Sequence, residues 1–266
     1  MARFDVYLEV ARKSFQRQLA YRAANVAGII TNTFFGAIYA FIFLALFEQR
    51  GPTAGLDARD VITYVVVSQS LLMAMSAFGN RDLSDAMIRG DIVIDLIRPV
   101  DFYLLWAALD LGRAMYYLLF RGIPTFTIGW LLFRPRLIDN PVTVGLFLLC
   151  VALGMAMSFA FRFVIGSLAF WTTDARGLNY LASIFILFFA GAIVPLNFFP
   201  DGLRAIVGWL PFQTMAHLPI SVYLGKVGGW ELARILAVQG AWLTGFVALG
   251  RWVLGRVMWR LSVQGG

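Results

Sequence analysis

The chain has 266 residues, of which 60% are hydrophobic and only 14% are charged, and its mean hydropathy is +0.76. A soluble domain carries roughly 25% charged residues, so this composition excludes a water-soluble globule and indicates an all-α integral membrane protein. The net charge of +7 does not indicate a nucleic-acid-binding protein, because the basic residues fall in short clusters between apolar runs instead of forming one patch.

Residues 1–24 are predicted to form an amphipathic interfacial helix. Apolar and basic side chains occupy different faces at helical spacing (Phe4, Tyr7, Leu8, Ala11, Phe15 and Leu19 against Arg12, Lys13, Arg17 and Arg22). Such a helix would lie in the headgroup layer. The alternative is a soluble extension of the first span. A cleavable signal is not expected, because the apolar run that follows is too long for one.

Residues 25–266 are expected to form a single transmembrane domain with six spans. Residues 25–47 carry no charge, and at ~1.5 Å per residue they make a helix of about 35 Å, long enough to cross the hydrocarbon core. Gly51, Pro52 and Gly55 end this span. The other spans are expected at about 61–78, 114–133, 142–170, 178–194 and 232–254. Pro141 suits the start of the fourth, and 102–113 is interpreted as an interfacial lead-in to the third.

The stretch 195–224 is too interrupted by prolines for a straight span and too apolar for an ordinary loop. Non-helical backbone survives at membrane depth only where protein or water satisfies its polar groups. We therefore expect a re-entrant helical hairpin, a pair of short helices, before the last span. Lys and Arg near the spans are more numerous on the side of the N-terminus, which predicts that both termini are cytoplasmic.

A few charged residues lie in or near the expected spans. Arg162 is roughly 13 Å inside the fourth by helical rise, so it should line a cavity for an anionic group, snorkel, or pair structurally. Asp110 and Arg113 are three residues apart and can pair, which favours an interfacial anchor over a proton relay, and Arg121 can snorkel or join them. Small residues also recur at four-residue spacing (Ala24, Gly28 and Asn32; Gly154 and Ser158; Ala237, Ala241 and Gly245) and permit close helix approach, within the chain or between copies.

The segment 81–101, between the second and third expected spans, is predicted to form a short helix at the cytoplasmic surface. Met87, Ile88, Ile92 and Leu96 can share one face, with acids and bases around them. The segment is either an ordinary amphipathic loop or a docking helix for a soluble subunit.

Motifs for catalysis or metal binding are absent from the sequence. His217 is the single histidine and Cys150 the single cysteine, which excludes a multi-histidine metal site and an intramolecular disulfide. No G-x-x-x-x-G-K-[ST], G-x-S-x-G or H-E-x-x-H motif occurs. We expect a non-catalytic chain with no cofactor of its own.

In these features the chain resembles the permease subunits of type-2 ABC exporters. An amphipathic N-terminal helix precedes six expected spans. The segment after the second expected span is similar to the family's Gly-then-Arg-Pro pattern. It reads Ile88-Arg89-Gly90-Asp91-Ile92 and continues to Leu96-Ile97-Arg98-Pro99. Residues 194–200 and 209–211 resemble its proline-punctuated stretch before the last span. The likeness covers essentially the whole chain, although Arg162 matches no part of the family pattern.

The resemblance implies a half-transporter in the cytoplasmic (inner) membrane of a prokaryote, moving an amphiphilic, lipid-like, drug-like or polymeric substrate out of the cell. Two permeases, identical or different, would pair in the lipid bilayer, each docked on a separate ATP-binding cassette subunit that holds ATP and Mg. The implied ATPase-coupling residues are Ile88, Gly90, Asp91, Leu96, Arg98 and Pro99. The implied substrate-path or gate residues are Arg162, Pro195, Asn197, Phe198, Pro200 and Pro211.

Two other functions remain open. An ion-coupled secondary transporter would need carboxylates inside the membrane, and Asp110, near the end of a span, is its only candidate. A membrane assembly scaffold would need no such group and is the second alternative.

Overall fold

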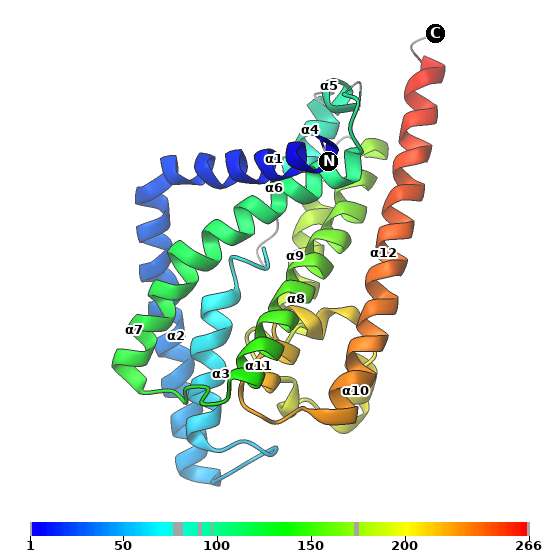
Figure 1. Ribbon diagram of the computed structural model, residues 1–266. Helices are drawn as coiled ribbons and strands as arrows, with labels where there is room; N and C mark the ends of the chain where they lie inside the picture. Colours follow the sequence, from blue (N-terminus) through cyan, green and yellow to red (C-terminus); the bar gives the residue numbers. More distant parts are fainter. Residues whose placement is uncertain (1, 77–81, 90–91, 97, 173–175, 265–266) are drawn as a thin grey trace.

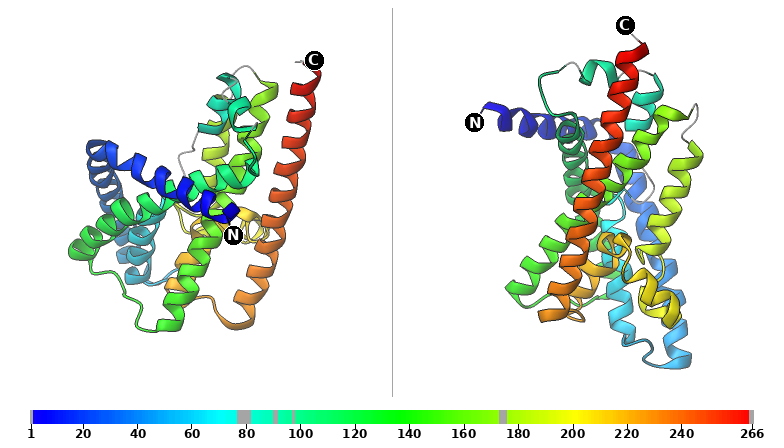
Figure 2. Two further views of the ribbon diagram at one scale, coloured as in Figure 1. Left: turned by 45° about the horizontal axis from the view of Figure 1, so that its top comes forward. Right: turned by 90° about the vertical axis from the view of Figure 1, so that its right-hand side faces the viewer.

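The computed structural model describes residues 2–76, 82–89, 92–96, 98–172 and 176–264. Within these ranges the regular elements are helical, apart from one isolated bridge between Thr53 and Leu56. The longest helices run between two ends of the molecule, and α1 (Ala2–Gln18) lies across one of those ends (Figures 1 and 2). The all-helical part of the fold prediction is therefore confirmed.

The chain turns sharply between α1 and α2 (Arg22–Arg50), through a single 3-10 turn at Leu19–Tyr21. The N-terminal helix is thus separate from the first apolar helix, as expected, and it ends six residues before the predicted boundary. α1 packs along α6 (Phe102–Tyr117), where Ser14 donates a 2.6 Å hydrogen bond to the carbonyl of Leu109. The amphipathic helix is therefore attached to the helical bundle through α6.

Helix α3 (Ala58–Leu71) begins three residues before the expected second span. The reason is a capping box, in which the Asp57 carboxylate accepts from the Asp60 amide at 2.7 Å and the Asp60 carboxylate accepts from the Asp57 amide at 3.2 Å. Twelve residues of α3, from Asp60 to Leu71, are buried. Such a helix is surrounded by protein and not by lipid.

The third predicted span, 114–133, and its predicted lead-in, 102–113, are continuous in the structure. α6 continues through a π-helical turn, η2 (Leu118–Gly122), into α7 (Ile123–Phe133), so the predicted lead-in and crossing form one helical run. α8 (Pro141–Leu168) begins at Pro141, as predicted, with the Asn140 side chain accepting from the Val142 amide.

Helix α9 (Arg176–Phe189) is shorter than the fifth expected span, 178–194. The backbone leaves the helix near Gly191, whose φ of +74° suits glycine. The last helix, α12 (Gly229–Gln264), is longer than the expected 232–254. Between them lie four short helical elements, not a pair: η4 (Leu196–Phe198), α10 (Asp201–Val207), η5 (Pro211–Met215) and α11 (His217–Tyr223).

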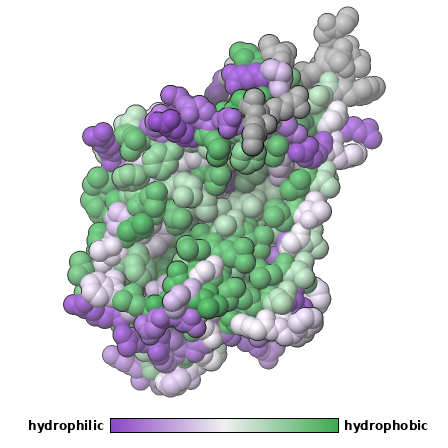
Figure 3. Space-filling view, in the orientation of Figure 1, coloured by the Kyte–Doolittle hydropathy of each residue, from purple (hydrophilic) through white to green (hydrophobic). Residues whose placement is uncertain are grey.

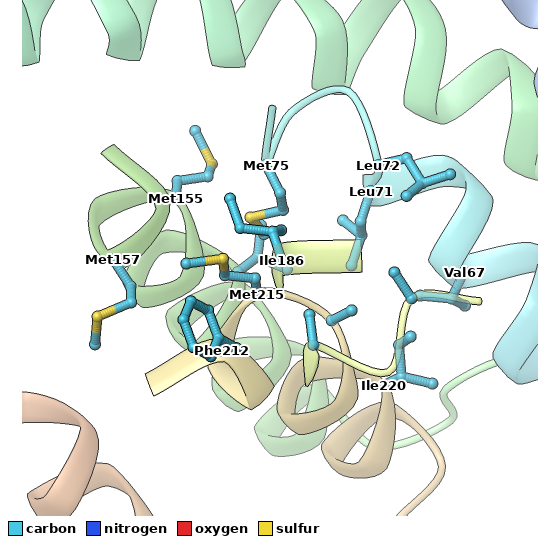
Figure 4. Close-up of a cluster of buried hydrophobic side chains, with 14 of the residues drawn as sticks. Val67, Leu71, Leu72, Met75, Met155, Met157, Ile186, Phe212, Met215 and Ile220 are labelled. Carbon is cyan, nitrogen blue, oxygen red and sulfur yellow. The ribbon is translucent and has the colours of Figure 1, made fainter. Parts of the chain in front are cut away.

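The largest buried apolar cluster lies where α3, α8 and α9 meet these short elements (Figure 4). It is rich in methionine, a flexible side chain that fills irregular gaps. Its members include Val67, Leu71, Met75, Met155, Met157, Ile186, Phe212, Met215 and Ile220. The segment before α12 is therefore packed into the bundle and is not a peripheral loop.

Three helical runs among the described residues are long and apolar enough to cross a bilayer: Phe4–Gln49, which takes in α1 and α2, Pro141–Trp171 and Gly229–Met258. The surface seen in Figure 3 has an apolar band between two hydrophilic ends. These features are those of a multi-pass membrane protein.

Candidate functional site

The predicted coupling segment lies at the end of the molecule where α1 crosses the bundle (Figure 1). It forms two short helices, α4 (Asp82–Arg89) and α5 (Ile92–Leu96), and not one. α4 contacts α8 and the 3-10 turn η3 (Ala169–Trp171) that follows it. The C-terminal part of α12 lies at the same end (Figures 1 and 2).

One face of α4 and α5 is anchored in the protein. Leu83, Met87 and Ile92 are buried in a cluster that contains Phe163 of α8 and Val257 of α12. Leu96 is partly buried against the same cluster. The predicted common face therefore holds for Met87, Ile92 and Leu96.

The prediction was wrong for Ile88, which is 45% exposed. Met87 and Ile88 are adjacent on α4 and therefore point to different sides of the helix. Ile94, which sequence reasoning missed, is 60% exposed. Arg98 pairs with Asp95 at 3.3 Å, and Pro99 is exposed. Gly90 and Asp91 lie outside the described residues.

Two polar contacts hold α4 against its neighbours. Arg17 of α1 pairs with Asp82 at 3.4 Å. Asn179 of α9 donates a buried hydrogen bond to the Ser84 hydroxyl at 2.9 Å. The segment is therefore connected to α1, α8, α9 and α12, which are separate in the sequence.

Beneath α4, one carboxylate on α6 accepts from two guanidinium groups. Arg113 Nη2 lies 2.8 Å from Asp110 Oδ1, and Arg162 Nη2 of α8 lies 2.9 Å from Asp110 Oδ2. All three side chains are 8% exposed. The predicted Asp110–Arg113 pair is observed, although it is buried between helices and not at a lipid-facing anchor. Arg162 is paired structurally, one of the alternatives that the sequence left open.

The Arg162 guanidinium is also oriented by α8 itself. Its Nε donates to the Ser158 hydroxyl at 3.2 Å, and that hydroxyl donates to the carbonyl of Met75. Arg121 does not join this group, since its Nη2 donates to Asn32 Oδ1 of α2 at 3.1 Å. Sequence reasoning did not foresee that Asp110 and Arg162 meet. The available signal was that each is a charge in an apolar helix that needs a partner.

A small polar cavity of about 80 Å³ separates α4 from these ion pairs. The residues that line it come from α1, α4, α6 and α8, and include Arg17, Asp82, Trp106, Asp110, Arg113 and Arg162. The cavity thus joins the coupling segment to the buried charges. No group of three or more His, Cys, Asp or Glu side chains suited to a metal occurs in the part of the chain that the structure describes.

Apart from Arg162, the predicted substrate-path or gate residues lie at the opposite end. Asn197 donates to the carbonyl of Ala54 at 3.2 Å, and Phe198 stacks on Phe43 of α2 with ring centroids 5.5 Å apart. Pro195 and Pro200 precede η4 and α10, and Pro211 is the first residue of η5. Pro195 and Pro211 are buried, whereas Pro200 is exposed. Arg162 lies far from this group in the chain and belongs to the ion pairs at the other end.

Side chains of α3 satisfy the irregular backbone that follows α9. Tyr64 donates to the carbonyl of Gly191 at 2.8 Å, and Ser68 donates to the carbonyl of Ala192 at 2.6 Å. The amide of His217 donates to the carbonyl of Ala190 at 2.9 Å. Sequence reasoning missed Tyr64 and Ser68. Their four-residue spacing, which places both on one face of α3, was the available signal.

Comparison with known protein families gives a match over most of the chain. Residues 34–264 match the family described as "ABC-2 family transporter protein". The match takes in α3 to α11, most of α2 and all of the described part of α12. No curated protein matches the sequence.

Proposed function

Since the chain belongs to the ABC-2 family of transporter proteins, we propose that it is the permease subunit of an ATP-driven exporter in the inner membrane of a prokaryote. The family implies partnership with ATP-binding cassette subunits. In our proposal two permeases pair with two such subunits, which bind and hydrolyse ATP with Mg on separate chains. The cargo is an amphiphilic, lipid-like, drug-like or polymeric molecule that moves out of the cytoplasm.

The observation that carries this proposal is the two-sided character of α4 and α5. Leu83, Met87 and Ile92 face the bundle, while Ile88 and Ile94 are exposed at its end. Exposed isoleucines beside charged residues, at the end that we propose lies in the cytoplasm, suit contact with a soluble protein. A partner docked there would contact a segment anchored in several helices.

A movement of α4 has a direct route into the bundle. Leu83 packs at the position of Gly166 on α8, where an added Cβ would lie 3.1 Å from Leu83 Cδ2. Asn179 connects α4 to α9, and the cluster around Met87 includes Val257 of α12. Protein interiors transmit such displacements because they are closely packed. We propose that ATP binding at the partner moves α4 and α5 and, through them, α8, α9 and α12.

We assign six spans to α2, α3, α6 with α7, α8, α9 and α12, with both termini in the cytoplasm. α3 and α9 have 14 residues each, or about 21 Å of helix, less than the ~30 Å hydrocarbon core. Their crossings would be completed by residues 72–76 and 190–194. Irregular backbone is tolerated in the membrane where protein groups satisfy its hydrogen-bonding capacity. The side chains of Tyr64 and Ser68 do this for the carbonyls of Gly191 and Ala192.

We further propose that residues 195–224 enter the membrane from the outer side and act as the outer gate. Asn197 and Phe198 contact the 51–57 loop and α2, while Phe212 and Met215 lie in the central apolar cluster. The segment thus connects the outer end to the middle of the bundle. Release of the Phe198 contact would open a route between α2 and α9.

The docking proposal is tested by co-purification. The exposed Ile88 and Ile94 are replaced together by Asp, and the variant is expressed with the ATP-binding cassette subunit encoded nearest to this gene. We expect membrane insertion to be unchanged, and both recovery of the ATPase and its stimulated hydrolysis rate to fall at least tenfold. Ile206→Asp, which changes an exposed isoleucine of α10 at the other end, is the control. Unchanged recovery and hydrolysis in the double variant would refute docking at α4 and α5.

A further inference from the structure

Two apolar hollows adjoin along the face between α6–α7 and α8. One, of about 490 Å³, lies between α6, α8 and α12, and the other, of about 440 Å³, lies between α7, α8 and α3. Leu118, Leu148 and Val151 line both hollows. Their surfaces are almost entirely apolar, and they open within the apolar band of the molecule (Figure 3).

The first hollow meets the small polar cavity beneath α4. Asp110 and Phe159 line both spaces. Of the charged residues that line the polar cavity, Arg17 and Asp82 are more than half exposed and pair with each other, whereas the buried Asp110, Arg113 and Arg162 leave an excess of one positive charge. A buried excess charge is costly and favours a bound counter-ion. The combined space is therefore cationic at one end and apolar along the rest of its length.

We propose that this space binds one anionic phospholipid of the bilayer. Its phosphate lies in the polar cavity near Arg17, Arg113 and Arg162, and an acyl chain follows α6 and α8 past Leu118. The run from Asp110 to Ile123 spans 13 residues, about 20 Å by helical rise. Half of the hydrocarbon core is about 15 Å thick, so the hollow accommodates a chain that enters from one leaflet.

The position of the cationic end fits a lipid headgroup. Arg17 belongs to α1, the amphipathic helix that crosses this end of the bundle. A helix of this kind places its charged face at headgroup depth. The apolar hollows then begin where the acyl region begins. A free small anion would use the cavity alone and would leave the hollows without an occupant.

The test uses the purified full-length chain in detergent and does not require an ATPase partner. Native mass spectrometry follows the binding of phosphatidylglycerol and of phosphatidylcholine with identical acyl chains. One excess basic group near a membrane surface predicts about a fivefold preference for the anionic lipid, with one lipid bound per chain. Inorganic phosphate in large excess should not displace it. Equal binding of the two lipids, or displacement by inorganic phosphate, would overturn the proposal.

Two variants probe the two halves of the site separately. Arg162→Gln should abolish the preference for phosphatidylglycerol, with Arg121→Gln as a control because Arg121 lies outside the cavity. Ala156→Trp fills the apolar hollow without changing a charge, and should reduce binding of both lipids at least fivefold. Leu149→Trp, an exposed residue of α8 outside both hollows, should bind as the wild type does.

Ala156 is on the exposed side of its helix, so its variant should fold even if Arg162→Gln does not. Unchanged lipid binding by folded Ala156→Trp would overturn the assignment of the acyl chain. Because lipid retention is measured without nucleotide or ATPase, its failure leaves the docking of α4 and α5 untouched. Likewise, failure of the docking test would leave the lipid proposal untouched.

Discussion

Arg162 of α8 and Asp110 of α6 lie 2.9 Å apart, although 52 residues separate them in the chain. Arg113 binds the other oxygen of the same carboxylate, so Asp110 pairs with both guanidinium groups. Loss of the Asp110 carboxylate should therefore destabilise the fold more than loss of either guanidinium. Removal of one partner from a buried ion pair costs roughly 3–5 kcal/mol.

We expect Asp110→Ala to lower the thermal unfolding temperature in detergent more than Arg162→Ala. The first variant leaves two buried cations without a carboxylate, whereas the second leaves the Asp110–Arg113 pair intact. The triple replacement of Asp110, Arg113 and Arg162 by leucine should recover much of the loss, because apolar residues replace a buried ion group at little cost. An Asp110→Ala protein as stable as the wild type would contradict this account.

Gly112 allows α1 to approach α6. A Cβ atom at this position would lie 2.0 Å from the carbonyl oxygen of Ala11, and backbone cannot move aside as a flexible side chain can. Gly112→Ala should therefore detach α1, which hydrogen exchange of residues 2–18 would detect as faster exchange. Gly145→Ala is the control, since no atom lies within 4 Å of an added Cβ there. Unaltered exchange in Gly112→Ala would show that the close contact is not needed.

Local chemistry made some elements predictable from sequence. Pro141 starts α8 because a proline at the first helical position lacks only an amide that has no helical partner. Gly51 ends α2 with a φ of +67°, a conformation that glycine adopts readily. In both cases the determinants lie within a few residues of the boundary.

Long-range contacts were not predictable in this way. No spacing rule brings Arg162 to Asp110, and nothing in the residues 118–122 signals the π-helical turn between α6 and α7. The sequence also does not show which stripes of small residues contact another helix. Gly154 meets the carbonyl of Thr214 within the chain, whereas Ala237 and Ala241 are exposed. Which stripe finds a partner depends on how whole helices are arranged.

The end of the molecule opposite α4 and α5 is held by an ion cluster centred on Arg136. Its guanidinium lies 2.6 Å from Asp57 and 2.9 Å from Asp60, and Lys226 lies 2.8 Å from Asp60. Partial burial alone would raise the pKa of the Asp57 carboxyl. The hydrogen bond from the Asp60 amide and the ion pair with Arg136 outweigh it and hold that pKa below its usual 3.8.

A lowered pKa in the folded state means that the charged Asp57 stabilises the fold at neutral pH. This contribution is complete above the usual pKa of 3.8 and is lost as the pH falls through the lower folded value. The difference in unfolding temperature between wild type and Asp57→Asn should therefore be constant near neutrality and shrink below pH 3.8. A difference that persists unchanged in stronger acid would rule out this cause.

The proposed orientation predicts which exposed positions face the outside. Cys150 is fully buried and is replaced by Ser, and single cysteines are then placed at Lys13, Asp139 or Asp201. A membrane-impermeant maleimide should label 139 and 201 in intact cells, and label 13 only after the inner membrane is permeabilised. The reverse pattern would invert the topology and place α4 and α5 outside, where no ATPase could reach them.

Tyr64 and Ser68 provide the donors that make the bend after α9 possible. Both carbonyls that they reach, those of Gly191 and Ala192, are buried and leave the helical pattern at the point where the proposed gate begins. Loss of a donor leaves a buried carbonyl unsatisfied, which costs about 1–3 kcal/mol. Tyr64→Phe and Ser68→Ala should therefore each lower the unfolding temperature and increase proteolysis within residues 195–224.

Thr31→Ala is the matched control, because the Thr31 hydroxyl donates only within its own helix, to the carbonyl of Ala27. In the proposed transporting complex, the Tyr64 and Ser68 variants should also uncouple ATP hydrolysis from transport, because they leave the proposed ATPase docking site at α4 and α5 intact while they loosen the proposed outer gate. Normal transport together with increased proteolysis would show that the bend serves stability alone. Transport and hydrolysis that fall together would place the effect at the docking end instead.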